Sequence, residues 1–307
     1  MKVGIIGAGN VGSATAFALI LRGIAREVIL IDIDEKKAKA EALDISHATT
    51  FAYASIVRAG DYSDLTCADV VIISAGANQK TGETRIALME RNVEILKSII
   101  NRILYYSPET IILVASNPVD IMTYYTLKLS GLPKNKVFGS GTILDTSRYR
   151  TLLGEHLGIS SKSIHANVVG EHGDSEVLVW SNADAGTIPL ETLSKELNRE
   201  FDWKIKATID DNVRNAAYKI IEGKGATFYG IAGGLSRICQ AISTNENAIL
   251  TVSSLHEEIE GVNNVCLSLP SIVNKNGIEK VIYPKFTPEE HLLLKASAQK
   301  LKDYMLL

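Results

Sequence analysis

The chain of 307 residues has few cysteines, no block of basic residues and no long apolar run. Its three cysteines, Cys67, Cys239 and Cys266, lie far apart in the sequence and form no CxxC pair. This usage argues against a disulfide framework or a zinc site and favours a reducing compartment. We therefore expect no bound metal.

Charge and hydropathy argue against two classes of partner. The formal net charge is −3, with acids and bases interspersed, so nucleic acid and anionic membranes are poor partners. No apolar stretch approaches the ~18 residues that a membrane span needs. The N-terminal sequence MKVGIIGAG runs straight into predicted structure, without the charged, apolar and cleavage regions of a signal peptide. The expectation is a cytoplasmic protein.

Residues 1–140 alternate between short apolar runs and helical patterns. Five runs rich in Val and Ile predict strands buried on both faces of a parallel sheet. They are residues 2–6, 27–32, 69–75, 110–116 and 136–141. Between them, apolar residues recur at helical spacing in segments 10–23, 35–48, 85–104 and 119–131. This alternation predicts an α/β fold with a doubly wound parallel sheet of the Rossmann type.

Residues 141–307 predict a second domain, of α+β type. Helical patterns and strand-like runs are mixed there, at residues 146–158, 227–242, 246–255 and 263–283. The sequence NKNG inside the last run supplies a hairpin turn. Further on, Thr287 and Glu290 form a capping box around Pro288, which predicts a C-terminal helix.

The sequence GAGNVG places Gly7, Gly9 and Gly12 after the first predicted strand and at the start of the first predicted helix. Such glycines let the backbone approach a pyrophosphate at a helix N-terminus, where free N–H groups and the dipole favour anions. Asp32 ends the next predicted strand. Its carboxylate can accept hydrogen bonds from the adenine ribose and repels a 2′-phosphate, which favours NAD over NADP. The alternative is that the glycines only permit close helix–strand packing.

A second group of reactive side chains lies in the predicted C-terminal domain. GEHGD puts His172 after the strand-like sequence HANVV, and LDTSRYR supplies Asp145 with Arg148 on the same helix face. A buried carboxylate beside an imidazole fixes its tautomer and favours the charged form, which makes the histidine a proton donor near neutral pH. The alternatives are a packed or surface histidine, and a surface ion pair between Asp145 and Arg148.

Taken together and in this order, six motifs resemble the L-lactate/malate dehydrogenase family, and specifically its bacterial L-lactate dehydrogenases. They are GAGNVG, GANQKTGETR, SNPVD, LDTSRYR, GEHGDSE and GATFYGIA, and the resemblance covers essentially the whole chain. It implies a homotetramer that reduces pyruvate reversibly to (S)-lactate with NADH.

The resemblance implies a role for each catalytic residue. His172 would protonate the 2-keto oxygen as hydride arrives from the nicotinamide, and Asp145 would orient His172. Arg148 would grip the substrate carboxylate through two parallel N–H bonds. Arg85 would polarise the carbonyl, brought onto the substrate when the glycine-flanked loop around residues 76–85 closes and excludes water.

Further residues would line the substrate pocket. Asn117 would hydrogen-bond the substrate oxygen or the nicotinamide ribose, unless it is only a turn residue. Thr227 would lie beside the substrate and Ile231 beside the nicotinamide, although periodicity alone assigns both to helix packing. Gln79 would face the C3 end of the substrate, where a neutral side chain suits pyruvate and an arginine suits oxaloacetate. The cofactor contacts that the resemblance implies are Gly7, Gly9, Val11, Gly12, Asp32, Lys37, Tyr62, Gly76, Ala77, Ser98, Ala115, Asn117, Ser140 and Ile231.

Arg150 needs a role of its own, because it lies roughly 200° round the helix from Arg148. In allosteric members of the family, an arginine and a histidine at the positions of Arg150 and His165 bind fructose 1,6-bisphosphate across a subunit interface. The bisphosphate would relieve repulsion between facing cations and favour the active tetramer. The alternative is a surface arginine and an unrelated strand histidine.

Three other functions share part of this pattern. A malate dehydrogenase would differ only in the group facing the variable end of the substrate. An NAD-dependent glycosidase would need a metal-binding Cys/His set, but the three cysteines lie outside every motif. A non-catalytic NAD sensor would need no set of Arg85, Asp145 and His172.

Overall fold

The computed structural model of the protein describes residues 1–76 and 85–306. Ala77 and Gln79, two of the predicted site residues, lie outside this range. Arg85 is described only by its backbone, as the first residue of helix α3.

Within the described residues, the largest sheet has nine strands in the order β12-β11-β10-β6-β5-β4-β1-β2-β3. Its parallel part runs from β3 to β6 and has the strand order of a Rossmann fold. These strands are β1 (Lys2–Ile6), β2 (Glu27–Ile31), β3 (Ile56–Ala59), β4 (Val70–Ile73), β5 (Ile111–Val114) and β6 (Val137–Gly139). The helices between them are α1 (Asn10–Leu21), α2 (Glu35–Ala48), α3 (Arg85–Tyr106) and α4 (Val119–Ser130).

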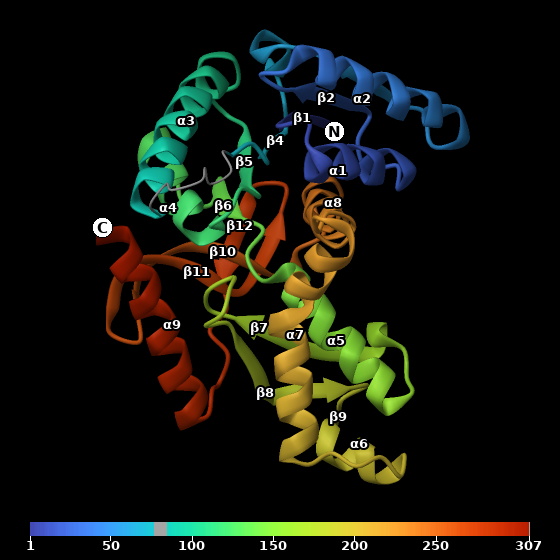
Figure 1. Cartoon of the computed structure of the whole chain (residues 1–307), viewed down its shortest axis with the longest axis vertical. Coiled ribbons are helices and arrows are strands. Elements are labelled where there is room, and N and C mark those ends of the chain that lie inside the picture. Colours follow the sequence, from blue (N-terminus) through green and yellow to red (C-terminus); the bar gives the residue numbers. More distant parts are fainter. Residues whose placement is uncertain (77–84, 307) are drawn as a thin grey trace.

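The parallel strands are apolar on consecutive positions because both faces of the sheet are covered. On β2, Ile29 and Ile31 pack into one hydrophobic core, and Val28 and Leu30 pack into another. Helices α3 and α4 cover the first core, whereas α1, α2 and α8 (Tyr229–Ser243) cover the second (Figure 1). The predicted doubly wound sheet is therefore confirmed.

One strand of this sheet was missed in the sequence. β3 lies at the sheet edge and carries the half-exposed Arg58 and the exposed Ile56, so it has no continuous apolar run. All five strands predicted in residues 1–140 are present, and so are the four predicted helices.

The second half of the chain contributes to two sheets. Its first elements, around a third core, are α5 (Ile143–Leu157), β7 (Ile164–Val169), β8 (Val177–Ala185), β9 (Ile188–Pro189), α6 (Leu190–Glu196) and α7 (Trp203–Lys224). After α8 come β10 (Ala248–Ile259), β11 (Val262–Asn274), β12 (Gly277–Val281) and α9 (Pro288–Leu306). Strands β7, β8 and β9 form a separate antiparallel sheet, but β10 pairs antiparallel with β6 and extends the large sheet (Figure 1).

Two local predictions in this half are confirmed. The NKNG sequence closes the β11–β12 hairpin, where Asn274 pairs with Gly277 and Gly277 has a φ of +93°. At the start of α9, the N–H of Glu290 donates to Thr287 Oγ1 at 3.2 Å and the N–H of Thr287 donates to Glu290 Oε2 at 2.9 Å. This reciprocal pair is a capping box.

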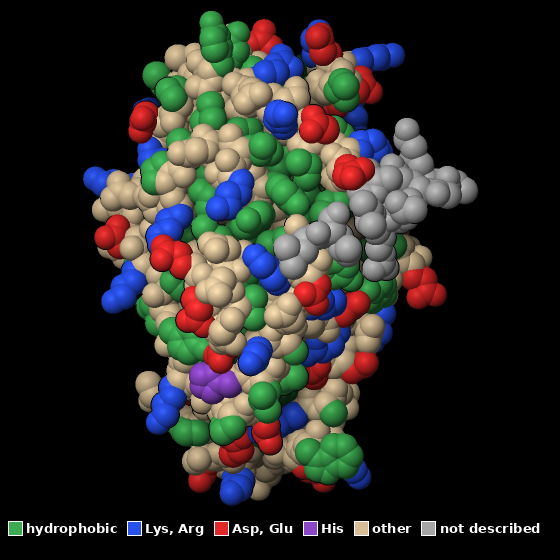
Figure 2. Space-filling model, turned by 90° about the vertical axis from the view of Figure 1, so that its left-hand side faces the viewer, with side chains coloured by type: hydrophobic (Ala, Val, Ile, Leu, Met, Phe, Trp, Pro, Cys, Tyr) green, Lys and Arg blue, Asp and Glu red, His purple; other side chains and the backbone are tan. Residues whose placement is uncertain are grey.

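No helix in the described part of the chain combines the length and hydrophobicity needed to cross a membrane. On the face drawn in Figure 2, cationic and anionic side chains are interspersed, as the sequence composition predicted.

Candidate active site

The glycine loop between β1 and α1 uses its three glycines in two different ways. Gly7 has a φ of +107°, and a Cβ at Gly12 would lie 1.9 Å from Gly7 O, so both residues serve close strand–helix packing. At Gly9, by contrast, a Cβ would meet nothing within 4 Å, and Gly9 caps α1 without a side-chain hydrogen bond. Packing explains Gly7 and Gly12 but not Gly9, which leaves open space at a helix N-terminus where a phosphate group fits.

Asp32 is bound to this loop. Its Oδ2 accepts a hydrogen bond from the N–H of Ala8 at 2.6 Å, and its Oδ1 accepts one from the N–H of Asp34 at 3.0 Å. The side chain is half-buried, so lone pairs remain accessible beside the glycine loop. Such lone pairs can accept hydrogen bonds from the hydroxyls of a ribose.

Several predicted cofactor residues gather around the carboxyl ends of the parallel strands. Gly76 follows β4, Asn117 follows β5 and Ser140 follows β6, and such ends meet at one edge of a sheet. A further three, Val11, Ala115 and Ile231, pack against one hydrophobic core.

The other predicted cofactor residues lie farther out. Lys37 on α2 and Ser98 on α3 have exposed side chains. Tyr62 is not a solvated surface residue, because only 7% of it is exposed and the guanidinium of Arg102 lies 3.8 Å from its ring centroid. Any contact of these three residues with a cofactor stays a prediction.

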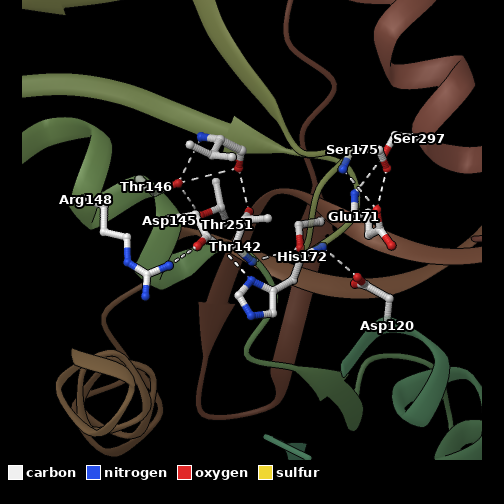
Figure 3. Close-up of polar contacts among 12 residues, drawn as sticks. Asp120, Thr142, Asp145, Thr146, Arg148, Glu171, His172, Ser175, Thr251 and Ser297 are labelled. Carbon is white, nitrogen blue, oxygen red and sulfur yellow. Dashed lines mark hydrogen bonds and ion pairs between the residues drawn. The ribbon is translucent and has the colours of Figure 1, made fainter. Parts of the chain in front are cut away.

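His172, Asp145 and Arg148 form one hydrogen-bonded group (Figure 3). His172 Nδ1 lies 2.6 Å from Asp145 Oδ2, and Arg148 Nη1 donates to Asp145 Oδ1 at 2.7 Å. The Asp145 side chain is only 2% exposed, so its pair with Arg148 is not a surface ion pair. The His172 side chain is 27% exposed. The carboxylate is therefore buried and the imidazole can be reached from solvent.

Helix α5 is fixed against strand β7, and this fixes Asp145 relative to the loop that follows β7. Thr142 Oγ1 donates to Val168 O at 2.5 Å, and the N–H of Val168 donates to Thr146 Oγ1 at 2.9 Å. One turn further along, Arg150 Nε donates to Ala166 O at 2.8 Å. Residues 142, 146 and 150 share one helix face because they are four apart.

The start of α8 packs beside the start of α5. A Cβ at Gly230 would lie 2.8 Å from Leu144 Cδ1, and one at Gly234 would lie 2.9 Å from Ile143 Cγ2. These glycines allow close helix approach. Thr227, which precedes α8, and Ile231, in its first turn, therefore belong to the end of α8 that packs beside the start of α5.

Burial and charge set the protonation of this group. Burial alone would lower the pKa of His172, but the negative charge of Asp145 and the hydrogen bond to it raise the pKa to about 9. Burial would raise the pKa of Asp145, but the charge of His172, their hydrogen bond and Arg148 hold it below its usual value. At neutral pH the pair is an imidazolium next to a carboxylate. Because Asp145 occupies Nδ1, Nε2 is the nitrogen that can give a proton to a substrate.

Two residues near His172 were missed in the sequence. Asp120 Oδ2 accepts a hydrogen bond from the backbone N–H of His172 at 2.8 Å. Glu176 is 3% exposed, and burial together with the charge of Asp145 raises its pKa to about 8. Asp120 is the last residue of the motif SNPVD, and Glu176 is the last residue of GEHGDSE. The motifs alone do not indicate that these two acids are buried.

The C-terminal helix braces the loop that carries His172. Ser297 Oγ on α9 accepts a hydrogen bond from the N–H of Glu171 at 2.8 Å. Glu171 Oε2 accepts hydrogen bonds from Ser175 Oγ at 2.5 Å and from Lys300 Nζ at 2.9 Å. Figure 3 shows the contacts among Glu171, Ser175 and Ser297 on the side of the loop away from Arg148.

Arg150 and Arg148 point in different directions, as predicted. Arg150 contacts Ala166 O and, through Nη2, Asn167 Oδ1 at 3.3 Å. Burial lowers its pKa, and within residues 1–76 and 85–306 it has no carboxylate partner. His165 lies on strand β7, which also carries these two partners of Arg150, and its side chain is exposed.

Two family models match the chain. Residues 1–139 match the NAD-binding domain of lactate/malate dehydrogenases, and residues 142–306 match the α/β C-terminal domain of the same family. The chain belongs to the lactate/malate dehydrogenase family. Its cofactor is NAD, in agreement with Asp32 beside the glycine loop and the open space at Gly9. This membership removes the glycosidase and the non-catalytic sensor from the alternatives.

Relatives in the family are similar over their whole length. The L-lactate dehydrogenase of Thermus aquaticus is 52% identical over 98% of this chain and 97% of its own. The L-lactate dehydrogenase of Allorhizobium ampelinum is 51% identical over 100% of this chain and 99% of its own. Among solved structures, a lactate dehydrogenase from a Medee basin deep-sea metagenome library has a TM-score of 0.96 at 41% identity, covering 100% of this chain and 99% of its own. The minor L-lactate dehydrogenase of Enterococcus mundtii has a TM-score of 0.95 at 38% identity, covering 99% of this chain and 97% of its own.

Proposed function

We propose that this member of the family is an L-lactate dehydrogenase that reduces pyruvate to (S)-lactate with NADH and also runs the reverse reaction. The observation that carries the proposal is the His172–Asp145–Arg148 group, because it pairs a proton donor with a guanidinium beside the NAD-binding edge of the sheet. The similarity to relatives named L-lactate dehydrogenase supports the choice of substrate. We further propose residues 1–140 as the cofactor domain and residues 141–307 as the substrate domain.

In the proposed reaction, the glycine loop and Asp32 would hold NADH, which would supply the hydride that the carbonyl carbon of pyruvate accepts. His172 Nε2 gives its proton to the carbonyl oxygen, which becomes the hydroxyl of lactate, and the neutral imidazole stays hydrogen-bonded to Asp145. Arg148 keeps one N–H on Asp145 and turns its remaining N–H groups to the substrate carboxylate. In the reverse direction, neutral His172 takes the proton back.

Four other residues take proposed roles from the family resemblance. Arg85 polarises the substrate carbonyl and stabilises the charge that develops on its oxygen. Asn117 hydrogen-bonds that oxygen or the nicotinamide ribose, and Thr227 lines the pocket. Gln79 faces the methyl group of pyruvate, where a second carboxylate would be buried without a countercharge. A neutral residue at this position is the reason to prefer pyruvate over oxaloacetate.

Activation by fructose 1,6-bisphosphate is the second part of the proposal. A half-buried arginine without a carboxylate partner in the described residues is a ready site for a phosphate group. Together with His165, Arg150 would hold the bisphosphate between subunits of a homotetramer.

The experiment that tests the function compares two substrates and two cofactors. Purified protein is assayed for kcat/KM with pyruvate and oxaloacetate, each with NADH and NADPH, and the product is separated by chiral chromatography. We expect pyruvate with NADH to be the best pair and the product to be the (S) enantiomer. A preference for oxaloacetate would instead assign the protein as a malate dehydrogenase.

A further inference from the structure

Side chains of α5 close the open edge of strand β7. This strand lies at the edge of the small sheet, where backbone groups need partners from elsewhere. Three residues of α5 and its N-terminus, Thr142, Thr146 and Arg150, bond to the backbone of Ala166 and Val168. Thr142 and Arg150 donate to carbonyl oxygens. Thr146 alone of the three accepts, from the N–H of Val168 at 2.9 Å.

The Thr146 hydroxyl also reaches a third element, β10. Its Oγ1 lies 2.9 Å from Thr251 Oγ1, so its hydrogen can go there or to Val168 O, 3.5 Å away. Both threonine side chains are buried, and Thr251 makes no other side-chain hydrogen bond to a residue that the structure describes. Strand β10 in turn pairs with β6, the last parallel strand of the large sheet. One buried oxygen thus joins α5, β7 and the large sheet.

Two of these elements carry the partners of the proton-transfer pair. Asp145 precedes Thr146 on α5, and His172 lies four residues beyond Val168, in the loop that follows β7. Figure 3 shows Thr146 and Thr251 beside Asp145. The distance of 2.6 Å between Asp145 Oδ2 and His172 Nδ1 therefore depends on how α5 is held against β7.

Packing alone does not require a hydroxyl at position 146. Valine has the same branched shape as threonine, so it would fill the same buried space. It would leave the N–H of Val168 without an acceptor in the core, and a buried unpaired donor is costly. The strand would then move relative to α5 until this N–H finds another partner. The hydroxyl of Thr146 therefore fixes β7 to α5 in a way that shape does not.

We propose that Thr146 is a positioning residue for the proton transfer, whose hydroxyl holds β7 against α5 and so sets the contact between Asp145 and His172. This inference rests on the proposed role of His172 as proton donor. Arg148 lies on α5 with Asp145, so a shift of β7 displaces the histidine from the carboxylate and from the substrate that Arg148 holds. The chemical step is then affected more than cofactor binding, which involves the glycine loop.

The charged side chains around His172 stay the same in the test. They are Asp145 and Arg148 on α5, Asp120 on α4, Glu171 and Glu176 on its own loop, Arg214 on α7 and Lys300 on α9. None of them bonds to Thr146 within residues 1–76 and 85–306. A changed pH dependence in a Thr146 variant thus reports a movement of these groups and not the loss of a charge.

Two substitutions separate the hydroxyl of Thr146 from its shape. Thr146→Val keeps the branched shape and removes the hydroxyl, whereas Thr146→Ser keeps the hydroxyl. We expect Thr146→Val to lower kcat for pyruvate reduction about 10- to 100-fold, because a small displacement of a catalytic group is costly. Thr146→Ser should recover most of this rate. NADH affinity, measured by fluorescence, should be nearly unchanged in both variants.

The pH dependence gives a readout that a loss of folded protein would not move. A longer contact between Asp145 and His172 stabilises the imidazolium less. The alkaline midpoint of kcat/KM should therefore fall by about one pH unit in Thr146→Val and return to the wild-type value in Thr146→Ser. A variant with fewer folded molecules instead loses rate equally at every pH, and its midpoint stays in place.

Thr126→Val is the matched control. Thr126 is also buried, but its hydroxyl bonds only within its own helix, α4, to Met122 O at 2.7 Å. This variant should keep the wild-type kcat and midpoint. Thermal unfolding identifies variants that fail to fold. If Thr146→Val does not fold, Thr146→Cys takes its place, because a thiol is only a weak acceptor.

The outcomes separate this inference from the proposed function. A lower kcat and a lower midpoint in Thr146→Val, both restored in Thr146→Ser, support the inference. If the folded variant keeps the wild-type kcat or the wild-type midpoint, Thr146 does not position the pair and the inference is overturned. It is also overturned if Thr146→Ser is as impaired as Thr146→Val. Turnover by His172→Asn at close to the wild-type rate would instead overturn the proposed function.

Discussion

His172 Nδ1 and Asp145 Oδ2 lie 2.6 Å apart, and they come from a loop and a helix 27 residues apart in the sequence. The hydrogen bonds between α5 and β7 hold this distance, because β7 leads directly into the loop. The contact leaves His172 Nε2 for the substrate and places the imidazole among acids. The proton chemistry of the site follows from this one pair.

The first prediction concerns pH. The pKa of His172 is raised to about 9, so its protonated form is present below that pH and is lost as the pH rises through it. Pyruvate reduction, which needs the proton, should fall above about pH 9, and lactate oxidation, which needs neutral His172, should rise toward the same pH. The measurement is kcat/KM in both directions across the pH range. A midpoint near the ordinary histidine value of ~6.5 would contradict the role of Asp145.

The second prediction concerns substrate choice by Gln79. Gln79→Arg should reverse the preference from pyruvate to oxaloacetate, because the arginine gains a charge pair with the second carboxylate and stays unpaired against the methyl group. The measurement is kcat/KM for both keto acids in both proteins. Asn78→Arg adds the same charge one residue earlier and should not reverse the preference. If Gln79→Arg still prefers pyruvate, Gln79 does not select the substrate.

The third prediction concerns Arg150. Fructose 1,6-bisphosphate should lower the apparent KM for pyruvate, and Arg150→Gln should remove this response with little effect on the fully activated rate. The exposed Arg26→Gln serves as the control and should respond like the wild type. The assays cover a range of about pH 5.5 to 7.5. A wild type that does not respond anywhere in this range rules out the site.

The fourth prediction concerns Glu176 and stability. Burial raises its folded-state pKa to about 8, whereas the unfolded value is ~4.5. The folded state thus holds the proton more tightly, and the wild type loses stability as the pH rises between these two values. Glu176→Gln stays neutral, so its Tm relative to the wild type should rise by roughly 3 °C or more from about pH 5 to about pH 8.5. The exposed Glu155→Gln on α5 is the control, and an equal, pH-independent difference in both variants would refute the assignment.

The sequence predicted the parallel sheet well because its signals are local. Strands β1, β2, β4, β5 and β6 are buried on both faces and read as continuous apolar runs. The edge strand β3 has no such run and was missed. Strands β10 to β12 were predicted as strands, but their attachment to the first sheet was not. That attachment rests on a long-range pairing, Ser253 with Gly139, which local patterns do not encode.

In the active site too, local signals were predicted from the sequence and long-range contacts were not. Asp145 and His172 were predicted as partners because motif order and chemistry point to both. Asp120 and Glu176 also stand in motifs that the sequence singled out, SNPVD and GEHGDSE, yet their places in the site depend on burial and on a backbone contact across the two halves of the chain. A short polar residue at the start of a helix reads from the sequence as a capping residue.

The central claim is that His172 transfers the proton in NADH-dependent pyruvate reduction, and one measurement tests it most directly. NADH consumption with saturating pyruvate is followed for the wild type and His172→Asn, with NADH binding to each protein measured by fluorescence. We predict rapid consumption by the wild type and a loss of about 10²–10⁴-fold in His172→Asn, with nearly unchanged NADH affinity. Turnover of pyruvate by His172→Asn at close to the wild-type rate would contradict the claim.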